Sequence, residues 1–172
     1  LTAGEHKQAA FLAKNRFGQV PVLEDGAAMI ADSNAILVYL ALQYDASRTW
    51  LPVDPLAAAE VQRFLSTAAG QIASGPAAAR LVNVFGAALD HQRAVAVAHN
   101  VLSVLESHLD GREWLVGNNP TIADVANYAY IAHAPEGDVS LDNYPHVRAW
   151  LGRIAALPGF VPMQATAVGL AA

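Results

Sequence analysis

Apolar residues change their spacing along the chain, and this change separates two regions. In the first region they form two short runs, 20–23 and 28–31, on either side of the turn Glu24-Asp25-Gly26. Two apolar runs joined by a short turn that contains glycine are typical of a β-hairpin. The pattern therefore predicts a pair of strands within the first 44 residues.

Helical spacing flanks this predicted hairpin on both sides. Residues 5–15 repeat apolar side chains at helical intervals, with Ala9, Phe11 and Leu12 on the expected inner face. Residues 33–43 predict a second helix. The side chains that line one side of it are Ile36, Leu37, Leu40 and Ala41.

Beyond residue 54 the apolar spacing is helical throughout. Residues 45–54 form a polar linker anchored by Trp50, and Asp54-Pro55 is typical of a helix start, an N-cap followed by proline. The inward residues of the helix that begins there are Val61, Phe64, Leu65, Ala68 and Ile72. Three further helices are predicted at 88–109 (with Val97, Val101, Val104 and Leu105 inward), at 121–134 and at 145–156.

Composition narrows the classes of function. The 172 residues are 54% hydrophobic and 15% charged, with a net charge of −5 and no cysteine. A negative balance without a basic cluster argues against a nucleic-acid partner, and no apolar run approaches the length of a membrane span. Without cysteine there is no thiolate metal site, and the six histidines form no helical ligand pair, so we expect no metal.

Two neighbouring motifs carry the candidate chemistry. Pro21 lacks an amide hydrogen and belongs at the start or edge of a strand, which leaves the backbone of Val20 free for an extended ligand. The bond between them is also a favoured place for a cis peptide. Asp32 and Ser33, at a helix start, can hold the amine and a carboxylate of a small peptide. Each of these residues also has a purely structural interpretation. Val20-Pro21 can be a turn at a strand edge, Ser33 can cap the helix, and Asp32 can place a favourable charge near the helix dipole.

Five segments follow one another in a familiar order. They are Gly4-Glu5-His6-Lys7 with Phe11, Leu12 and Asn15; Gln19-Val20-Pro21-Val22-Leu23; Asp32-Ser33-Asn34-Ala35-Ile36; Trp114-Leu115-Val116-Gly117 with Thr121-Ile122-Ala123-Asp124; and Tyr144-Pro145 with Trp150-Leu151 and Leu157-Pro158-Gly159-Phe160. In this order they resemble the cytosolic glutathione S-transferases of the theta-like and bacterial type. The resemblance covers nearly the whole chain.

The resemblance implies an α+β fold. A partial thioredoxin-like, glutathione-binding domain is expected at 1–44, the linker at 45–54, and an all-α helical-bundle domain at 55–172. The family begins with a strand, a helix and a strand that supply its catalytic tyrosine, serine or cysteine, and this N-terminal segment is expected to be missing here. The catalytic residue is therefore unknown. A cytoplasmic location is implied as well.

For the site, the resemblance implies that glutathione lies as an added strand beside Val20-Pro21. Asp32 would accept a hydrogen bond from the γ-glutamyl ammonium, and Ser33 would donate one to the γ-glutamyl carboxylate. His6 and Gln19 match positions that contact the glycyl carboxylate. For His6 alone, a solvated surface histidine is an equal interpretation.

The implied function is that of a glutathione transferase, in which the thiolate of bound glutathione attacks an apolar electrophile. A two-fold homodimer is implied, with the first domain of one chain against the long helices of the other. The alternative is a non-catalytic binding or scaffold module on the same fold. Thr121 and Asp124 have the spacing of a capping box, so we expect them to be structural. Phe64 and Phe85 are expected in the core.

Overall fold

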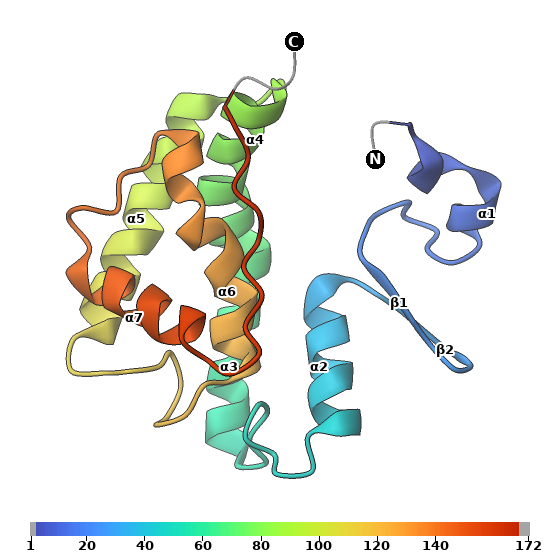
Figure 1. Ribbon diagram of the computed structural model, residues 1–172, viewed down its shortest axis with the longest axis horizontal. Coiled ribbons are helices and arrows are strands. Elements are labelled where there is room, and N and C mark those ends of the chain that lie inside the picture. Colours follow the sequence, from blue (N-terminus) through green and yellow to red (C-terminus); the bar gives the residue numbers. More distant parts are fainter. Residues whose placement is uncertain (1–2, 169–172) are drawn as a thin grey trace.

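The computed structural model describes residues 3–168 (Figure 1). The first region contains the helices η1 (Glu5–Lys7), α1 (Ala9–Leu12) and α2 (Ser33–Tyr44) and the strands β1 (Val22–Asp25) and β2 (Ala28–Ala31). The second region contains α3 (Pro55–Thr67), η2 (Ala68–Ala77), α4 (Ala78–Phe85), α5 (His91–Leu109), α6 (Ile122–Ala132), η3 (Ala134–Gly137) and α7 (Pro145–Ala155). In Figure 1 these later helices form a bundle, α2 stands beside it, and the hairpin and α1 lie beyond α2. The predicted α+β fold is confirmed.

The hairpin is a two-stranded antiparallel sheet. Its register runs from Val22 opposite Ala31 to Asp25 opposite Ala28. The first strand begins two residues later than predicted, because Pro21 cannot donate to the ladder and pairing starts only after it. The backbone just before β1 is therefore left outside the sheet.

The helix predicted at 5–15 is interrupted. Gln8 has an extended backbone, with φ −82° and ψ 155°, and separates the single turn of η1 from the single turn of α1. Two isolated turns cannot present one continuous inner face, so Ala9 is exposed while Phe11 and Leu12 are half-buried. The prediction of one amphipathic helix was wrong here.

Residues 55–85 form one continuous helical rod made of α3, η2 and α4. Asp54 caps its start with a side chain that accepts a backbone hydrogen bond, as predicted. The middle part, η2, is a π-helix and contains Pro76, which cannot donate to the helical ladder. Gly75 lets η2 approach α5 closely, because a Cβ there would lie 2.9 Å from the backbone nitrogen of Ala98.

The core lies in the second region, and α5 supplies its central stripe. The buried residues of this helix are Ala94, Ala98, Val101, Leu102, Leu105 and Leu109. Val101 and Leu105 confirm the prediction, but Val97 is only half-buried and Val104 is 63% exposed. The buried stripe repeats every three or four residues, which places Val104 on the outer face.

The two phenylalanines predicted to be core residues differ. Phe64 is buried at 2% exposure, as expected, whereas Phe85 is 49% exposed. Phe85 is the last residue of α4, and its ring lies 5.5 Å from the guanidinium of Arg80. A position at a helix end left its ring on the surface, so the prediction was wrong for Phe85.

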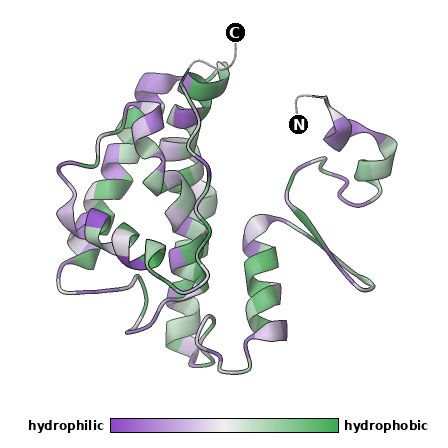
Figure 2. Ribbon diagram, in the orientation of Figure 1, coloured by the Kyte–Doolittle hydropathy of each residue, from purple (hydrophilic) through white to green (hydrophobic). Residues whose placement is uncertain are grey.

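Helix α2 links the two regions and is apolar on nearly all sides (Figure 2). At its start, the Asn34 side chain donates to the carbonyl of Leu65 in α3 at 2.9 Å. At its end, the hydroxyls of Tyr44 and Tyr39 donate to the Asp25 carboxylate of β1 and hold the pKa of Asp25 below its usual value. Both ends of α2 are thus tied, one to the bundle and one to the hairpin.

The linker is anchored through Trp50, as predicted. The Trp50 amide donates to the Asp45 carboxylate at 2.8 Å, and its carbonyl accepts from the amide of Ile122 at 2.9 Å. Hydrogen bonds from Ser47 and Trp50 lower the pKa of Asp45. We keep 1–44, 45–54 and 55–172 as proposed domain bounds; residues 1–2 and 169–172 of the outer two lie outside the described part of the chain.

Candidate functional site

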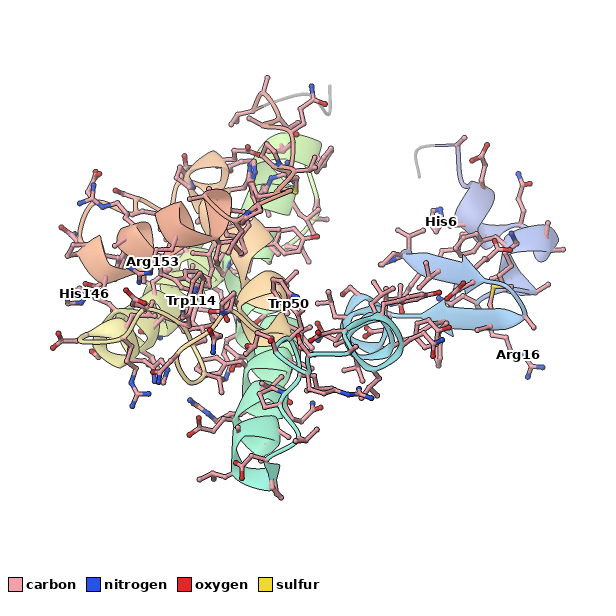
Figure 3. The ribbon with its side chains drawn as sticks, turned by 60° about the horizontal axis from the view of Figure 1, so that its bottom comes forward. His6, Arg16, Trp50, Trp114, His146 and Arg153 are labelled. Carbon is pink, nitrogen blue, oxygen red and sulfur yellow. The ribbon has the colours of Figure 1, made fainter. Side chains whose placement is uncertain are left out.

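A hollow of about 630 Å³ lies where η1, the loop before β1 and the start of α2 meet. Six of its residues are those that the sequence singled out: His6, Gln19, Val20, Pro21, Asp32 and Ser33. They come from three separate segments, and the fold brings all of them together. Figure 3 shows His6 beside the hairpin, away from the bundle that carries Trp114, and Arg16 at the outer edge of the first region.

The Val20–Pro21 peptide bond is cis, as the sequence predicted. Within residues 3–168 the backbone of Val20 makes no hydrogen bond with protein, and Val20 is 49% exposed. An amide and a carbonyl that are unpaired beside a strand, in a residue that is partly exposed, can pair with an extended peptide. Unpaired backbone therefore lies just before β1, where the chain borders the hollow.

Asp32 is the N-cap of α2. Its Oδ1 accepts from the amides of Asn34 at 2.9 Å and Ala35 at 3.0 Å. The backbone of Asp32 lies at φ +81° and ψ 131°, an uncommon region for a residue other than glycine. Such strained positions cluster at functional sites and cost about 1–3 kcal/mol each.

The structural interpretation of Ser33 as the helix cap was wrong, because Asp32 holds that position and Ser33 is the first helical residue. Since Asp32 takes the next two amides, the amide and the hydroxyl of Ser33 are the groups left at this end of α2. Among residues 3–168 neither has a hydrogen-bond partner. A carboxylate can therefore be received at Ser33, where the helix dipole also favours negative charge.

His6, Lys7 and Gln19 also line the hollow. His6 carries a buried Nδ1 atom without a hydrogen-bond partner. The ammonium of Lys7 donates to the carbonyl of Gly18 at 2.9 Å and adds a positive charge on this side. Sequence reasoning assigned no role to Lys7, although a basic residue next to a candidate anion-binding histidine was a usable signal.

Asn15 was also missed as a contributor. It lines the hollow and is only 7% exposed. An asparagine three residues before a glycine is a turn signal, and Gly18 indeed lies at φ +58°. The sequence therefore contained a signal for the turn, although not for the contacts of the Asn15 side chain.

The acidic residue of the second region that was considered for catalysis, Asp124, has a structural role. Asp124 is 1% exposed and forms the predicted capping box with Thr121. The Oδ2 of Asp124 accepts from the Thr121 amide at 2.8 Å, and the Thr121 hydroxyl accepts from the Ala123 amide at 3.2 Å. The other carboxylate oxygen of Asp124 accepts from the Leu115 amide at 2.9 Å and from the Trp150 indole at 2.8 Å. In the part of the chain that is described, no helix could cross a bilayer, and no group of three metal-ligating side chains is assembled.

A second hollow of about 370 Å³ is apolar and lies between α2 and α6. It is lined by Leu37, Leu40, Ala41, Tyr44, Asp45, Trp50, Ile122 and Val125. Most of these α2 residues are near the Tyr44 end, and eleven helical steps place that end roughly 16 Å from Ser33. This hollow is therefore separate from the polar one.

The first region has mixed α and β structure and a polar hollow at the start of a helix, and a helical bundle follows it. This combination is typical of glutathione-binding transferases. Residues 1–42 match the family model for the glutathione S-transferase N-terminal domain, and residues 81–158 match that for the C-terminal domain. The chain belongs to the glutathione S-transferase family.

Curated relatives agree with this assignment. Glutathione S-transferase 3 of Zea mays is 36% identical over 175 residues, which cover 93% of this chain and 77% of the relative. Glutathione S-transferase theta-2 of Homo sapiens is 31% identical over 168 residues, which cover 92% of this chain and 69% of the relative. The theta-like resemblance is confirmed.

Solved structures have the same fold. A glutathione S-transferase from Pseudomonas fluorescens superposes with a TM-score of 0.85 at 32% identity, covering 94% of this chain and 81% of that one. A glutathione transferase homologue from Drosophila mojavensis, solved with bound glutathione, gives 0.79 at 28% identity, covering 92% and 74%. Since these relatives are transferases, the non-catalytic alternative is not favoured.

Proposed function

We propose that the polar hollow binds glutathione in an extended form and that the chain is a glutathione transferase acting on an apolar electrophile. The observation that supports this most is the unpaired backbone of Val20 beside the start of α2. Glutathione has a peptide backbone, one ammonium and two carboxylates, and the hollow offers a complementary group for each.

In this arrangement the cysteinyl backbone pairs with Val20 by strand addition. The free Oδ2 of Asp32 accepts from the γ-glutamyl ammonium, while Oδ1 keeps its capping bonds to α2. The Ser33 amide and hydroxyl donate to the γ-glutamyl carboxylate. His6 and Gln19, which also line the hollow, donate to the glycyl carboxylate, and Lys7 adds a favourable charge nearby.

The reaction follows from the thiol that this binding presents. Stabilising the thiolate lowers the pKa of the glutathione thiol, which releases its proton to solvent, and the thiolate sulfur then forms a bond to the electrophilic carbon. The leaving group departs with the electron pair of the broken bond. The binding residues contribute by fixing the position of the sulfur.

Calorimetric titration with glutathione tests the proposal. Asp32→Asn retains an oxygen that can cap α2 but removes the charge facing the ammonium, so the affinity should fall about tenfold while the melting temperature changes little. Asp90→Asn is the matched control, because Asp90 caps α5 in the same way through the amide of Arg93. It should leave the affinity unchanged. Wild-type protein without measurable affinity, or Asp32→Asn with wild-type affinity, would contradict the proposal.

The second part of the proposal is a homodimer. The outer face of α5 carries Val104, at 63% exposure, and forms a shallow groove with Arg63 and Thr67 of α3. The first region exposes Phe17 at 81%. These apolar side chains fit the arrangement of one chain's first domain against the long helices of the other.

Sedimentation analysis distinguishes this interface from other apolar surface. Val104→Asp should convert the dimer to a monomer, because a charge would be buried without a partner. Val161→Asp, at a valine that is 84% exposed beyond α7, is the control and should leave the dimer intact. A wild-type monomer would reject the dimer without affecting the glutathione proposal.

A further inference from the structure

The loop that precedes β1 is held together by one buried side chain. The Nδ2 of Asn15 donates to the carbonyl of Gln19 at 2.8 Å, and its Oδ1 accepts from the amide of Phe17 at 3.1 Å. The backbone carbonyl of Asn15 also accepts from the amide of Gly18 at 2.9 Å. The side-chain nitrogen, the side-chain oxygen and the backbone carbonyl of Asn15 therefore all form hydrogen bonds within residues 15–19.

This bracing sets the direction of the Val20 amide. The carbonyl of Gln19 and the N–H of Val20 belong to the same trans peptide group, in whose plane they point in opposite directions. Because Asn15 fixes the carbonyl toward the inside of the loop, the N–H of Val20 is directed away from Asn15. The unpaired Val20 amide is thus oriented by a hydrogen bond to the carbonyl of its own peptide group.

The braced loop also sits tightly on η1. A Cβ at Gly18 would lie 2.8 Å from the carbonyl oxygen of His6, and the ammonium of Lys7 donates to the Gly18 carbonyl. A change in the loop is therefore transmitted to His6 as well as to Val20. Gly18 thus joins the loop before β1 to η1 at the hollow.

We propose that Asn15 is a positioning residue for glutathione, which acts by holding the Gln19–Val20 peptide in the orientation that pairs with the ligand. This inference rests on the proposed function. It assigns no direct ligand contact to Asn15 and explains why a polar side chain is buried at this loop.

Two variants separate positioning from simple stabilisation. Asn15→Ala removes both side-chain hydrogen bonds, and Asn15→Asp keeps an acceptor for the Phe17 amide but has no donor for the Gln19 carbonyl. Each should weaken glutathione binding about tenfold, the effect of losing one well-placed hydrogen bond. In a ¹⁵N-valine spectrum, the Val20 amide resonance should shift in both free variants and respond less to added glutathione.

Asn127→Ala is the matched control. Asn127 is fully buried in the bundle and donates to two carbonyls, those of Phe64 at 3.0 Å and Ala123 at 2.8 Å. Its removal should lower the melting temperature and leave glutathione affinity at the wild-type value. If Asn15→Ala does not fold, the affinity of Asn15→Asp for glutathione alone tests the positioning role.

The outcomes distinguish the positioning role of Asn15 from the proposed function. Wild-type affinity in a folded Asn15 variant would overturn the positioning role while leaving the proposed function intact. A wild-type protein that fails to bind glutathione would overturn the proposed function, and the positioning role with it. A loss of affinity in Asn127→Ala equal to that in Asn15→Ala would show that general destabilisation is the cause and would also overturn the inference.

Discussion

The helical region and the first region bury their side chains to very different degrees. In the helical region Trp150, Leu102 and Leu115 are fully buried, whereas among residues 3–44 Ala41 is the one apolar side chain in the core. Burial of apolar surface is the main stabilising contribution in folded proteins. The helical region therefore supplies most of the stability, and the first region carries the groups that we propose to bind glutathione.

The first region is held instead by polar and aromatic contacts. Tyr39 and Tyr44 bind Asp25, Lys14 pairs with Glu24, and Asn15 braces its own loop. Such contacts contribute modestly when exposed, but they fix direction. A site that must present unpaired backbone cannot itself be buried, so this division follows from what the site has to do.

Removing the carboxylate of Asp124 should give the largest loss of stability. Asp124→Ala leaves the Trp150 indole, the Leu115 amide and the Thr121 amide without their acceptor inside the core. Each buried donor costs about 1–3 kcal/mol, so we expect roughly 4 kcal/mol in all and a melting temperature about 10 °C lower. Glutathione affinity, measured by calorimetry below the transition, should not change.

Asp54→Ala is the control for that experiment. Asp54 also caps a helix, but it accepts a single backbone hydrogen bond and is exposed. Its loss should cost about 1 kcal/mol. Equal effects of the two substitutions would show that Asp124 acts only as a cap, and a fall in affinity with Asp124→Ala would break the separation between the regions.

Crowding the contact between η3 and α4 should give the next largest effect. A Cβ at Gly137 would lie 2.6 Å from the backbone nitrogen of Arg80 and 2.8 Å from the carbonyl carbon of Ala79. Backbone atoms of a packed helix cannot yield cheaply, so Gly137→Ala should destabilise by about 1–3 kcal/mol in urea unfolding. A neutral result would mean that η3 moves freely on the bundle.

Local signals were enough to predict several elements from the sequence. The helix predicted at 145–156 is Pro145–Ala155, and that predicted at 33–43 is Ser33–Tyr44. A proline or a capping residue marks each start, and these act within one turn. The hairpin was also predicted, with an error only at the position of Pro21.

The errors arose where contacts between residues far apart in the sequence determine the structure. The outer position of Val104 and the exposure of Phe85 depend on which face the neighbouring helices cover, and spacing alone does not specify this. In the site, six of the residues that line the hollow were named from the sequence, four from the two motifs and two, His6 and Gln19, from the family resemblance. The bracing by Asn15 was not predicted, because it depends on the path of a loop through Gly18.

Glu136 connects the bundle to the chain beyond α7, and its contribution should depend on pH. Its carboxylate is 14% exposed and accepts from Arg80, His133 and the amide of Thr166. Burial raises the pKa of Glu136, but the hydrogen bonds from His133, Thr166 and Arg80 together lower the pKa by more, so the net shift is downward. A group whose pKa is lower in the folded state stabilises above its unfolded pKa, near 4.5, and loses that effect as the pH falls.

Glu136→Gln should therefore cost about 1–2 kcal/mol at pH 7, and the difference from wild type should shrink below about pH 4.5. Urea unfolding at pH 7 and at pH 3.5 measures both values. Glu60→Gln, at an exposed position on α3, is the control and should be neutral at each pH. A difference that persists unchanged at the lower pH would show that shape, and not charge, accounts for the role of Glu136.

Filling an open helical glycine should give the smallest effect and the opposite sign. Gly152 lies inside α7, and a Cβ there would meet no atom within 4 Å. Alanine restricts the unfolded chain and favours the helix, so Gly152→Ala should stabilise by about 0.5–1 kcal/mol. Because this gain belongs to the helical region, it should raise the melting temperature while leaving the affinity for glutathione unchanged. A gain in stability accompanied by a change in affinity would mean that α7 is coupled to the hollow.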